Sequence, residues 1–182
     1  MMDNGTDIAS LPRAPAVPGL TFRRFRGADD YAPLAAVREG VRDRDRVDPR
    51  SPREGIPTAE DIARMHAGTP PGSPDMLVVE VEGTVVGYNR LAWWTEQDGA
   101  NVYLHLGWLL PQWRGQGIGT VMLRWAEGWL RAVAATQKAE GRLAAGPTVF
   151  GTNASSTERE ATALVLREGY TAYHRLSDPL LP

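Results

Sequence analysis

The feature that most constrains this chain is a glycine-rich turn that joins an apolar strand to an amphipathic helix. The turn runs from Gln112 to Thr120 and has glycine at the alternate positions Gly115, Gly117 and Gly119. Glycine has no Cβ, so the backbone can approach a ligand closely, and the unpaired N–H groups that open the following helix point toward that ligand. The positive end of the helix dipole adds to these donors. The pattern therefore predicts a phosphate-binding turn.

Two common phosphate-binding motifs do not fit the spacing of these glycines. A P-loop needs a lysine followed by Ser or Thr after its second glycine, whereas Gly119 is followed directly by Thr120 and no lysine lies nearby. A dinucleotide-binding turn has the spacing G-x-G-x-x-G between parallel strands. Here the spacing is G-x-G-x-G, and the pattern upstream predicts an antiparallel hairpin. The turn is typical of neither motif.

The composition is that of one ordinary globular domain. The 182 residues are 42% hydrophobic and 23% charged, and the net charge is −2. A chain of this length typically buries about 70% of the surface that it exposes when unfolded. There is no polybasic run and no apolar stretch long enough to cross a bilayer, so we expect neither nucleic acid nor a membrane as a partner.

Cysteine and histidine usage and the N-terminal segment exclude further kinds of site and a signal peptide. The chain has no cysteine, which excludes disulfides, a thiol nucleophile and a thiolate metal site. His66, His105 and His174 are scattered without ligand spacing, so we expect no metal. Residues 1–19 contain three prolines but have neither a charged n-region nor an apolar h-region. We therefore expect a flexible N-terminal extension over residues 1–19 and a cytoplasmic protein.

Alternating and helical patterns of apolar residues predict strands and helices along the rest of the chain. The predicted strands are Leu20–Arg26, Met76–Val81, Thr84–Trp93, Val102–Leu110, Thr148–Thr152 and Tyr170–Leu176. The predicted helices run from Ala28 to Val41, from a Thr58 cap past Met65, from Ile118 past Trp129, and from a capping box of Thr157 and Glu160 to Gly169. Arg42–Glu54 is typical of a solvated loop, with a substrate-covering loop as the alternative.

The long helix after the glycine turn is predicted to pack on the sheet. Its apolar residues lie on one stripe at helical spacing, formed by Ile118, Val121, Met122, Trp125 and Trp129. Gly128 interrupts this helix, where glycine costs about 1 kcal/mol relative to alanine, and indicates close packing at that position.

The glycine turn and its surroundings resemble the GNAT superfamily of N-acetyltransferases. The signature of that family is Arg or Gln, two residues, Gly, one residue and Gly, and Arg114, Gly117 and Gly119 satisfy it. Leu106–Pro111 looks like the apolar strand that precedes the signature, and the order of elements agrees from Leu20 to Leu176. The resemblance implies a mixed α/β (α+β) fold over residues 20–182, with a mostly antiparallel mixed sheet that is flanked by helices and splayed at an acetyl-CoA cleft.

The resemblance also implies where acetyl-CoA binds as co-substrate. The backbone N–H groups of the turn would hold the pyrophosphate, while main-chain groups near Trp108 and Leu109 would pair with the pantetheine arm and polarise the thioester carbonyl. Asn153 resembles an asparagine that some members place near the coenzyme, or it simply caps a turn. The coenzyme-binding residues implied in and beside the turn are Arg114, Gly115, Gln116, Gly117, Ile118, Gly119 and Thr120.

The usual catalytic residues of the family are missing from their positions. Tyr103 stands where many members have a glutamate as general base, and Val165 stands where many have a tyrosine that protonates the leaving thiolate. On a regular strand Tyr103 and His105 share a face, and an imidazole can act as general base near neutral pH, so these two are the catalytic candidates. A packed, hydrogen-bonded histidine is the alternative for His105. Tyr170 and Tyr173 are further candidates for the acid.

The resemblance implies an enzyme that moves an acetyl group from acetyl-CoA to a primary amine of a small molecule or peptide by direct attack in a ternary complex. The alternative is a non-catalytic acyl-CoA sensor or an inactive half of a tandem protein, as in the mycothiol acetyltransferases. The last strand usual in the family has no counterpart in the sequence, and a partner, such as a second copy in a homodimer, could supply it.

The sequence gives one further indication about the acceptor. Trp93 and Trp94, followed by Glu96 and Asp98, could present an aromatic and acidic rim to a cationic amine. The alternative is one buried and one exposed tryptophan, because alternate side chains of a strand face opposite sides.

Overall fold

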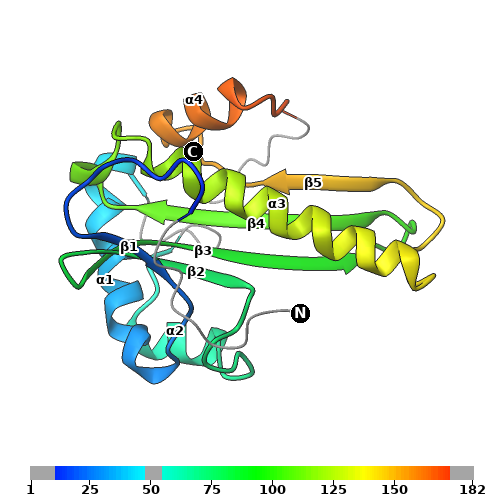
Figure 1. The fold of residues 1–182 in the computed structure, drawn as a ribbon, viewed down its shortest axis with the longest axis horizontal. Helices are drawn as coiled ribbons and strands as arrows, with labels where there is room; N and C mark the ends of the chain where they lie inside the picture. Colours follow the sequence, from blue (N-terminus) through cyan, green and yellow to red (C-terminus); the bar gives the residue numbers. More distant parts are fainter. Residues whose placement is uncertain (1–10, 48–54, 173–182) are drawn as a thin grey trace, which may run out of the picture.

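A mixed five-stranded sheet forms the centre of the molecule (Figure 1). The structure is a computed structural model that describes residues 11–47 and 55–172. In chain order its elements are β1 (Leu20–Arg23), α1 (Ala28–Asp45), α2 (Ala59–Met65), β2 (Met76–Val81), β3 (Thr84–Thr95), β4 (Asn101–Leu109), the short 3-10 helix η1 (Pro111–Trp113), α3 (Ile118–Ala139), β5 (Thr148–Thr152) and α4 (Arg159–Arg167).

The sheet has the order β1-β2-β3-β4-β5 and opens between its last two strands. Neighbouring strands are antiparallel except for β4 and β5, which are parallel. The pairing of β4 with β5 ends at His105 and Thr152, whereas β4 continues to Leu109. Figure 1 shows β5 stopping partway along β4. The expected mixed sheet that splays beside the glycine turn is confirmed.

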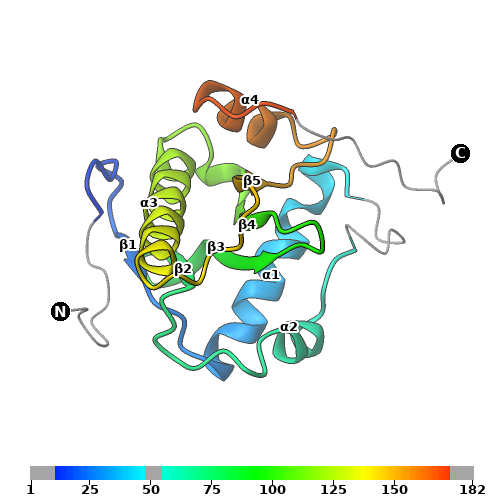
Figure 2. The same ribbon diagram turned by 90° about the vertical axis from the view of Figure 1, so that its right-hand side faces the viewer.

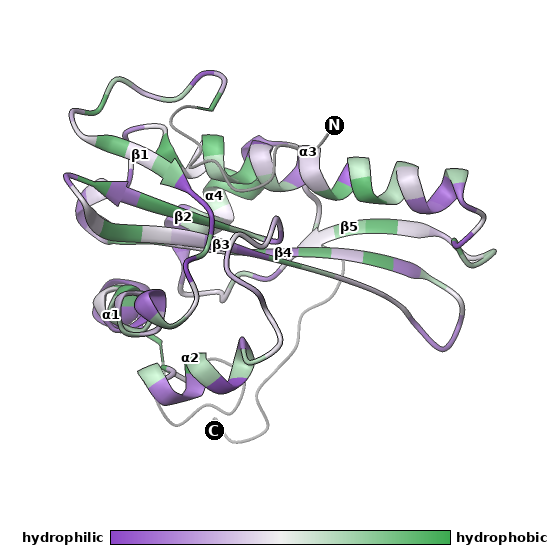
Figure 3. Cartoon of the chain, turned by 60° about the horizontal axis from the view of Figure 1, so that its bottom comes forward, coloured by the Kyte–Doolittle hydropathy of each residue, from purple (hydrophilic) through white to green (hydrophobic). Residues whose placement is uncertain are grey.

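Helices cover the two faces of the sheet. Figures 2 and 3 show α3 on one face, α1 and α2 on the other, and Figure 2 shows α4 beyond the β5 side. On the α3 face, Leu109 packs with Ile118 and Met122, and on the opposite face Trp108 packs with Leu34 and its neighbours. Because side chains alternate along a strand, odd-numbered residues of β4 face α3 and even-numbered residues face α1.

A buried ion network fixes the start of α1 against the sheet. The guanidinium of Arg23 in β1 donates to both carboxylate oxygens of Asp30 at 2.6 and 2.9 Å, and its Nε donates to Glu80 of β2 at 2.6 Å. All three side chains are almost fully buried. Removal of one member of such a network leaves an unpaired buried charge, so the network holds α1 in one position on the sheet.

The first helix is longer than the sequence predicts. The charged stretch from Arg42 was expected to be a loop, but α1 continues to Asp45 and ends at Arg46, which adopts a left-handed conformation. Glu39 pairs with Arg42 one turn later, and Asp45 is buried against Arg114. The prediction was wrong here because these charges find partners, one of them 69 residues away in the sequence. The remainder of the predicted loop, residues 48–54, lies outside the described residues.

The inward face of α3 is broader than the predicted stripe. Ile118, Val121 and Met122 are buried as expected, but Trp125 and Trp129 are only half-buried. The remaining buried positions of the helix are small or aliphatic: Leu123, Ala126, Leu130 and Ala134. Gly128 is exposed, and a Cβ there would meet nothing within 4 Å, so the close packing predicted for it is wrong.

Several predicted element ends can be compared with the structure. The Thr58 cap of α2 is confirmed, with a capping box to Asp61. The capping box of Thr157 is wrong: α4 begins after Glu158, whose carboxylate accepts instead from the N–H of Ser155. Tyr170–Ala172 do not form the start of a strand, and the other residues of that predicted strand lie outside the described part of the chain.

Part of the N-terminal segment packs on the domain. Leu11, Ala14 and Val17 contact the cluster formed by β1, β2 and α3. Pro15 lies beside the glycine turn, where its Cβ would be 3.7 Å from a Cβ placed on Gly117. Within the predicted extension, residues 11–19 therefore line one side of the domain, and residues 1–10 lie outside the described residues.

Candidate functional site

The glycine turn leaves a row of backbone donors open at the start of α3. Gly115 and Gly117 have φ angles of 74° and 89°, which side chains rarely tolerate, and Gly117 is the N-cap of α3. No side chain caps this helix, and no acidic residue lies in its first turn. Among the described residues, none accepts from the N–H groups of Ile118, Gly119 and Thr120. These donors and the helix dipole together fit an anionic group.

The edge of β4 next to this turn also carries main-chain groups that do not pair with a neighbouring strand. The N–H of Leu110 donates to the carbonyl of Val86 in β3, and the N–H of Asn101 donates to the carbonyl of Pro147, which precedes β5. By alternation, the main-chain groups of Trp108 face β3, while those of Gly107 and Leu109 face away from it. Since β5 no longer pairs beyond His105, these groups border the splayed part of the sheet.

Gly107 was not singled out from the sequence. A Cβ at this position would lie 2.4 Å from Oδ1 of Asn89, whose amide donates to the carbonyl of Met122 in α3. The buried Asn89 side chain therefore occupies the space that a larger residue would need. The sequence did contain one signal for Gly107, the alternation along a strand. Gly107 lies two residues before Leu109, so its main-chain groups point to the same side as those of Leu109.

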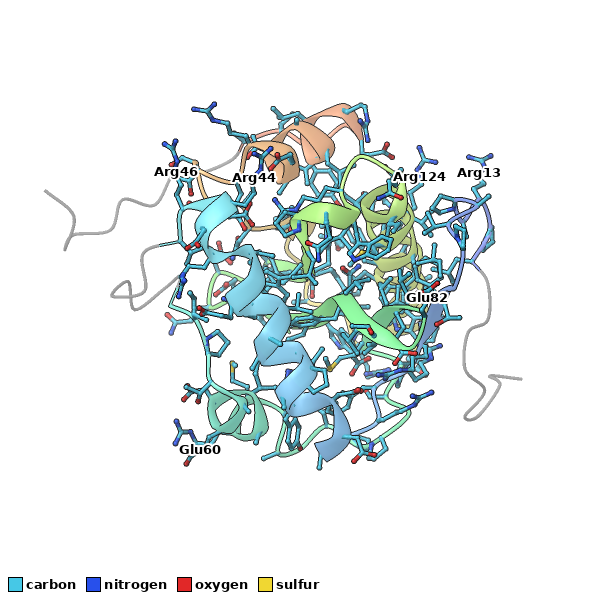
Figure 4. The ribbon with its side chains drawn as sticks, turned by 90° about the vertical axis from the view of Figure 1, so that its left-hand side faces the viewer. Arg13, Arg44, Arg46, Glu60, Glu82 and Arg124 are labelled. Atoms are coloured by element: carbon cyan, nitrogen blue, oxygen red, sulfur yellow. The ribbon has the colours of Figure 1, made fainter. Side chains whose placement is uncertain are left out.

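Arg114 connects three elements around the turn. Its Nε donates to the carbonyl of Leu109 at 2.9 Å, and its terminal nitrogens donate to both oxygens of Asp45 at 2.6 and 2.7 Å and to Glu160 at 3.1 Å. The hydrogen bond with Asp45 contributes most to raising the pKa of Arg114. Figure 4 shows Arg44 at the end of α1 facing α4, where it pairs with Glu160. The guanidinium of Arg114 therefore ties β4, α1 and α4 together.

His105 and Tyr170 meet on the α3 face, at the last residue pair before the sheet splays. The Nε2 atom of His105 lies 2.8 Å from the hydroxyl of Tyr170, and the two rings meet edge to face. Burial lowers the pKa of His105 to about 4, so its imidazole is neutral near pH 7. Burial and the neighbouring carboxylate of Glu127 raise the pKa of Tyr170. The pair thus consists of a neutral imidazole and a phenol that keeps its proton.

Tyr103 shares the α3 face with His105, as alternation requires, but lies in the paired part of the sheet. It pairs in register with Phe150 of β5, and the two rings stack at 5.1 Å. Its hydroxyl donates to Gln137, near the C-terminal end of α3. The structure therefore does not bring Tyr103 together with the open edge of β4.

The Tyr103 side chain contributes to a cavity at the far end of the hairpin. The cavity has a volume of about 360 Å³ and is lined mainly by Trp93, Trp94, Gln137 and Arg142. Trp93 is half-buried, whereas Trp94 is 42% exposed and its indole N–H donates to Glu96 at 2.7 Å. Each face of β3 thus carries one of the two rings.

The other candidate residues lie around the glycine turn and α4. Asn153 is exposed and directly follows β5, one residue after the partner of His105. The hydroxyl of Thr120 accepts a hydrogen bond from Arg167 of α4 at 3.1 Å, and the side chain of Gln116 donates to the carbonyl of Gln112. Val165 is half-buried in α4. Tyr173 and His174 lie outside the described residues.

Two kinds of feature are absent from residues 11–47 and 55–172. No helix in these ranges is long and apolar enough to cross a membrane. The same ranges contain no group of three or more His, Cys, Asp or Glu side chains that could hold a metal ion.

The fold and the glycine turn have the arrangement typical of GNAT family domains. The family model described as "Acetyltransferase (GNAT) family" matches residues 39–144, more than half of the chain. The chain belongs to this family. No curated protein sequence matches it.

Solved structures with the same fold are distant in sequence. One is a GCN5-related N-acetyltransferase from Sphaerobacter thermophilus, with a TM-score of 0.67, 18% identity, and coverage of 89% of this chain but 45% of that one. YncA of Salmonella typhimurium, a putative acetyltransferase with acetyl-CoA, has a TM-score of 0.58, 18% identity, and coverage of 86% and 82%. A predicted acetyltransferase with acetyl-CoA from Clostridium acetobutylicum has a TM-score of 0.53, 14% identity, and coverage of 90% and 94%. The chain spans less than half of the Sphaerobacter protein.

Proposed function

We propose that the protein transfers an acetyl group from acetyl-CoA to a primary amine of a small molecule or peptide, by direct attack within a ternary complex. One observation carries this proposal: the edge of β4 formed by Gly107 and the N–H of Leu109 is not paired with β5 and leads directly into a glycine turn with open N–H groups. A ligand with a hydrogen-bonding arm and a pyrophosphate matches both features. Membership of the GNAT family and the acetyl-CoA present in the Salmonella and Clostridium relatives support it.

The residues of the turn fit this ligand in charge and space. The N–H groups of Ile118, Gly119 and Thr120 would hold the pyrophosphate, and a Cβ at Gly115 would meet nothing, which leaves room for its oxygens. Arg114 is already engaged by Asp45 and Glu160, so its part is to hold the turn in place. Asn153 and the main chain of Gln116 would border the coenzyme. We assign residues 20–182 to this domain.

Acetyl-CoA supplies a thioester, which is already activated toward attack by an amine. An N–H of Gly107 or Leu109 aimed at the thioester oxygen would stabilise the negative charge that develops there, an effect that can contribute several kcal/mol. Binding of both substrates at the open edge of β4 would also hold the amine close to the thioester, so that a bimolecular reaction becomes effectively unimolecular.

The reaction moves one proton from the attacking nitrogen to the leaving sulfur. We propose that the pair of His105 and Tyr170 handles this proton. His105 is unprotonated at neutral pH and can accept a proton through water, while Tyr170 retains a proton at its hydroxyl that it can donate to the sulfur. The hydroxyl of Tyr103 is hydrogen-bonded to Gln137, so Tyr103 would have a structural role and help to fix β4 against α3.

A domain that binds acyl-CoA without catalysis is the second candidate. The specific observation in its favour is that Tyr103 and Val165 replace the glutamate and tyrosine that many family members use. Val165 carries no proton, and Tyr103 lies away from the open edge. Such a domain would bind acetyl-CoA as a sensor, or as one half of a tandem protein, and would release no thiol.

Titration calorimetry with acetyl-CoA, followed by an assay for free thiol after addition of an amine panel, separates these functions. Binding with thiol release supports the transferase, and binding without release supports the sensor. Absence of binding contradicts both.

A matched pair of variants tests the turn itself. Gly117→Asp and Gly117→Asn have nearly the same shape, and both residues tolerate positive φ better than other side chains do. Only Asp adds a negative charge at the proposed pyrophosphate site. We expect Gly117→Asp to weaken acetyl-CoA binding at least tenfold more than Gly117→Asn. Equal affinities of the two variants would argue against a pyrophosphate at this turn.

A further inference from the structure

Two arginines lie on the face of the sheet opposite α3, next to the splayed part of β4. Arg38 projects from α1, and its guanidinium carbon lies 4.4 Å from the ring centre of Trp108. Arg90 belongs to β3 and pairs in register with Leu106 of β4. Since Tyr88 and Arg90 alternate on the same strand, both face α1, and Tyr88 is the register partner of Trp108.

The positive charges of both arginines act on the hydroxyl of the buried Tyr88. Burial raises the pKa of the Tyr88 hydroxyl, and the positive charges of Arg38 and Arg90 both oppose that rise. The Tyr88 and Trp108 rings are 4.7 Å apart. Arg38, Tyr88, Arg90 and Trp108 therefore form one arginine–aromatic cluster on the α1 face.

The positive charge of this cluster is not neutralised within the described residues. Arg38 donates to the carbonyl of Gly55, and among residues 11–47 and 55–172 neither it nor Arg90 has a carboxylate partner. The neighbouring His66 supplies no negative charge in either protonation state, and burial and the charge of Arg90 lower its pKa. Most acidic side chains of α1 and α2 pair with other arginines: Asp30 with Arg23, Glu39 and Asp43 with Arg42, Asp45 with Arg114, and Glu60 and Asp61 with Arg64.

The cluster lies within reach of the proposed reaction centre. Trp108 is adjacent in the chain to both Gly107 and Leu109, whose main-chain groups border the splayed edge. A ligand whose anionic group meets Arg38 and Arg90 would therefore bring atoms only a few bonds away toward that edge. An α-amino acid has this geometry, because one carbon separates its carboxylate from its amine. Polycationic amines would instead be repelled by two uncompensated guanidiniums.

We infer that the arginine–aromatic cluster of Arg38, Tyr88, Arg90 and Trp108 is the acceptor-binding subsite, and that the acceptor is a small amine of the α-amino acid class whose carboxylate meets the two arginines. The inference rests on the proposed function and specifies its substrate. Arginine forks match carboxylates with paired hydrogen bonds, and the guanidinium of Arg38 packs over the ring of Trp108.

The test compares amino acids with their own amides. Protein loaded with coenzyme A is titrated by calorimetry with glycine, leucine, phenylalanine, methionine and glutamate, and then with the matching α-carboxamides and with spermidine. Each pair differs by the α-carboxylate charge alone. We expect at least one acid to bind tenfold or more tightly than its amide, and spermidine to bind more weakly than that acid.

Two variants locate this preference in the molecule. Arg90→Gln should reduce the acid-to-amide preference at least fivefold. Arg13→Gln serves as the matched control and should keep the preference, because Arg13 is an exposed arginine of the N-terminal segment that lies far from Glu60 of α2 in Figure 4. An unchanged preference in Arg90→Gln would overturn the subsite.

Titration of the same preparation with acetyl-CoA separates the two levels of failure. If acetyl-CoA binds but the amides or spermidine bind as well as the acids, or no acid binds at all, the inference about the acceptor is wrong and the proposed function stands. If acetyl-CoA itself fails to bind, the proposed function is wrong and the acceptor subsite falls with it.

Discussion

Burial of His105 under α3 removes the water that would stabilise the protonated form of its imidazole. The side chain is 4% exposed, and its pKa falls from the ordinary value of 6.5 to about 4. Between these two pH values the unfolded chain binds a proton that the folded protein does not bind. The free energy of unfolding therefore rises with pH across this window, and the stability that His105 supports is lost as the pH falls from 6.5 toward 4.

This linkage predicts that His105→Gln flattens the dependence of stability on acid pH. The shift corresponds to about 3 kcal/mol between pH 6.5 and pH 4. Urea unfolding of both proteins across this range measures the effect, and part of the slope should persist because burial also lowers the pKa of His66. Parallel stability curves for the variant and the parent protein would contradict the assigned pKa.

Single residues of the site were predictable only where chain-local rules apply. The shared face of Tyr103 and His105 follows from alternation, and the open glycines follow from their spacing. By contrast, the contact of His105 with Tyr170 joins positions that are 65 residues apart, and no local pattern marks it. The exclusion of Tyr103 from the open edge likewise depends on its register with Phe150.

At the scale of elements, Arg114 and Asp45 connect the end of α1 to the glycine turn. Asp45 is 3% exposed, so removing its partner leaves a buried and unpaired carboxylate. Arg114→Met should reduce the free energy of unfolding by about 3 to 5 kcal/mol, as expected for half of a buried ion pair. The double variant Arg114→Met with Asp45→Leu should recover much of this loss, because it leaves no uncompensated charge.

Arg44→Met is the control for this experiment. Arg44 pairs with Glu160 of the same cluster, but its side chain is 61% exposed, and exposed pairs contribute at most about 1 kcal/mol. Guanidinium unfolding of all three variants provides the comparison. If Arg114→Met costs no more than Arg44→Met, the connection between α1 and the turn has no special role in stability.

The elements themselves were well predicted where hydrophobic periodicity was strong. The bounds of β2 and β5 agree with those expected, and the hairpin of β2 and β3 and the start of α3 are as predicted. The errors fall at ends that tertiary contacts decide. The last turn of α1 looked like a charged loop because the partner of Asp45 is in another part of the sequence, and α4 lacks its predicted cap because Glu158 bonds to Ser155 instead.

At the scale of the whole molecule, the residues of β2 are more deeply buried than those of β5 and α4. Every residue of β2 is buried, whereas none of β5 or α4 is, and Val149 of β5 is 45% exposed. We expect hydrogen exchange to be at least tenfold faster in β5 and α4 than in β2 and β3. Acetyl-CoA should slow exchange in β5 and in the first turn of α3, while leaving β2 unchanged. Uniform protection across the sheet would contradict this division.

The regular register of β3 and β4 also bears on the kinetic order expected of the proposed transferase. Because no bulge interrupts the pairing of Gly87–Thr95 with Asn101–Leu109, each side chain of β4 keeps its face along the whole strand. The glycine turn then opens on the α3 side, and the arginine–aromatic cluster opens on the α1 side. Coenzyme and acceptor would enter from opposite faces of the sheet, so each could bind before the other. For the proposed transferase we therefore expect a sequential steady-state rate law with random order of addition, in which coenzyme A can depart while the acetylated product is still bound.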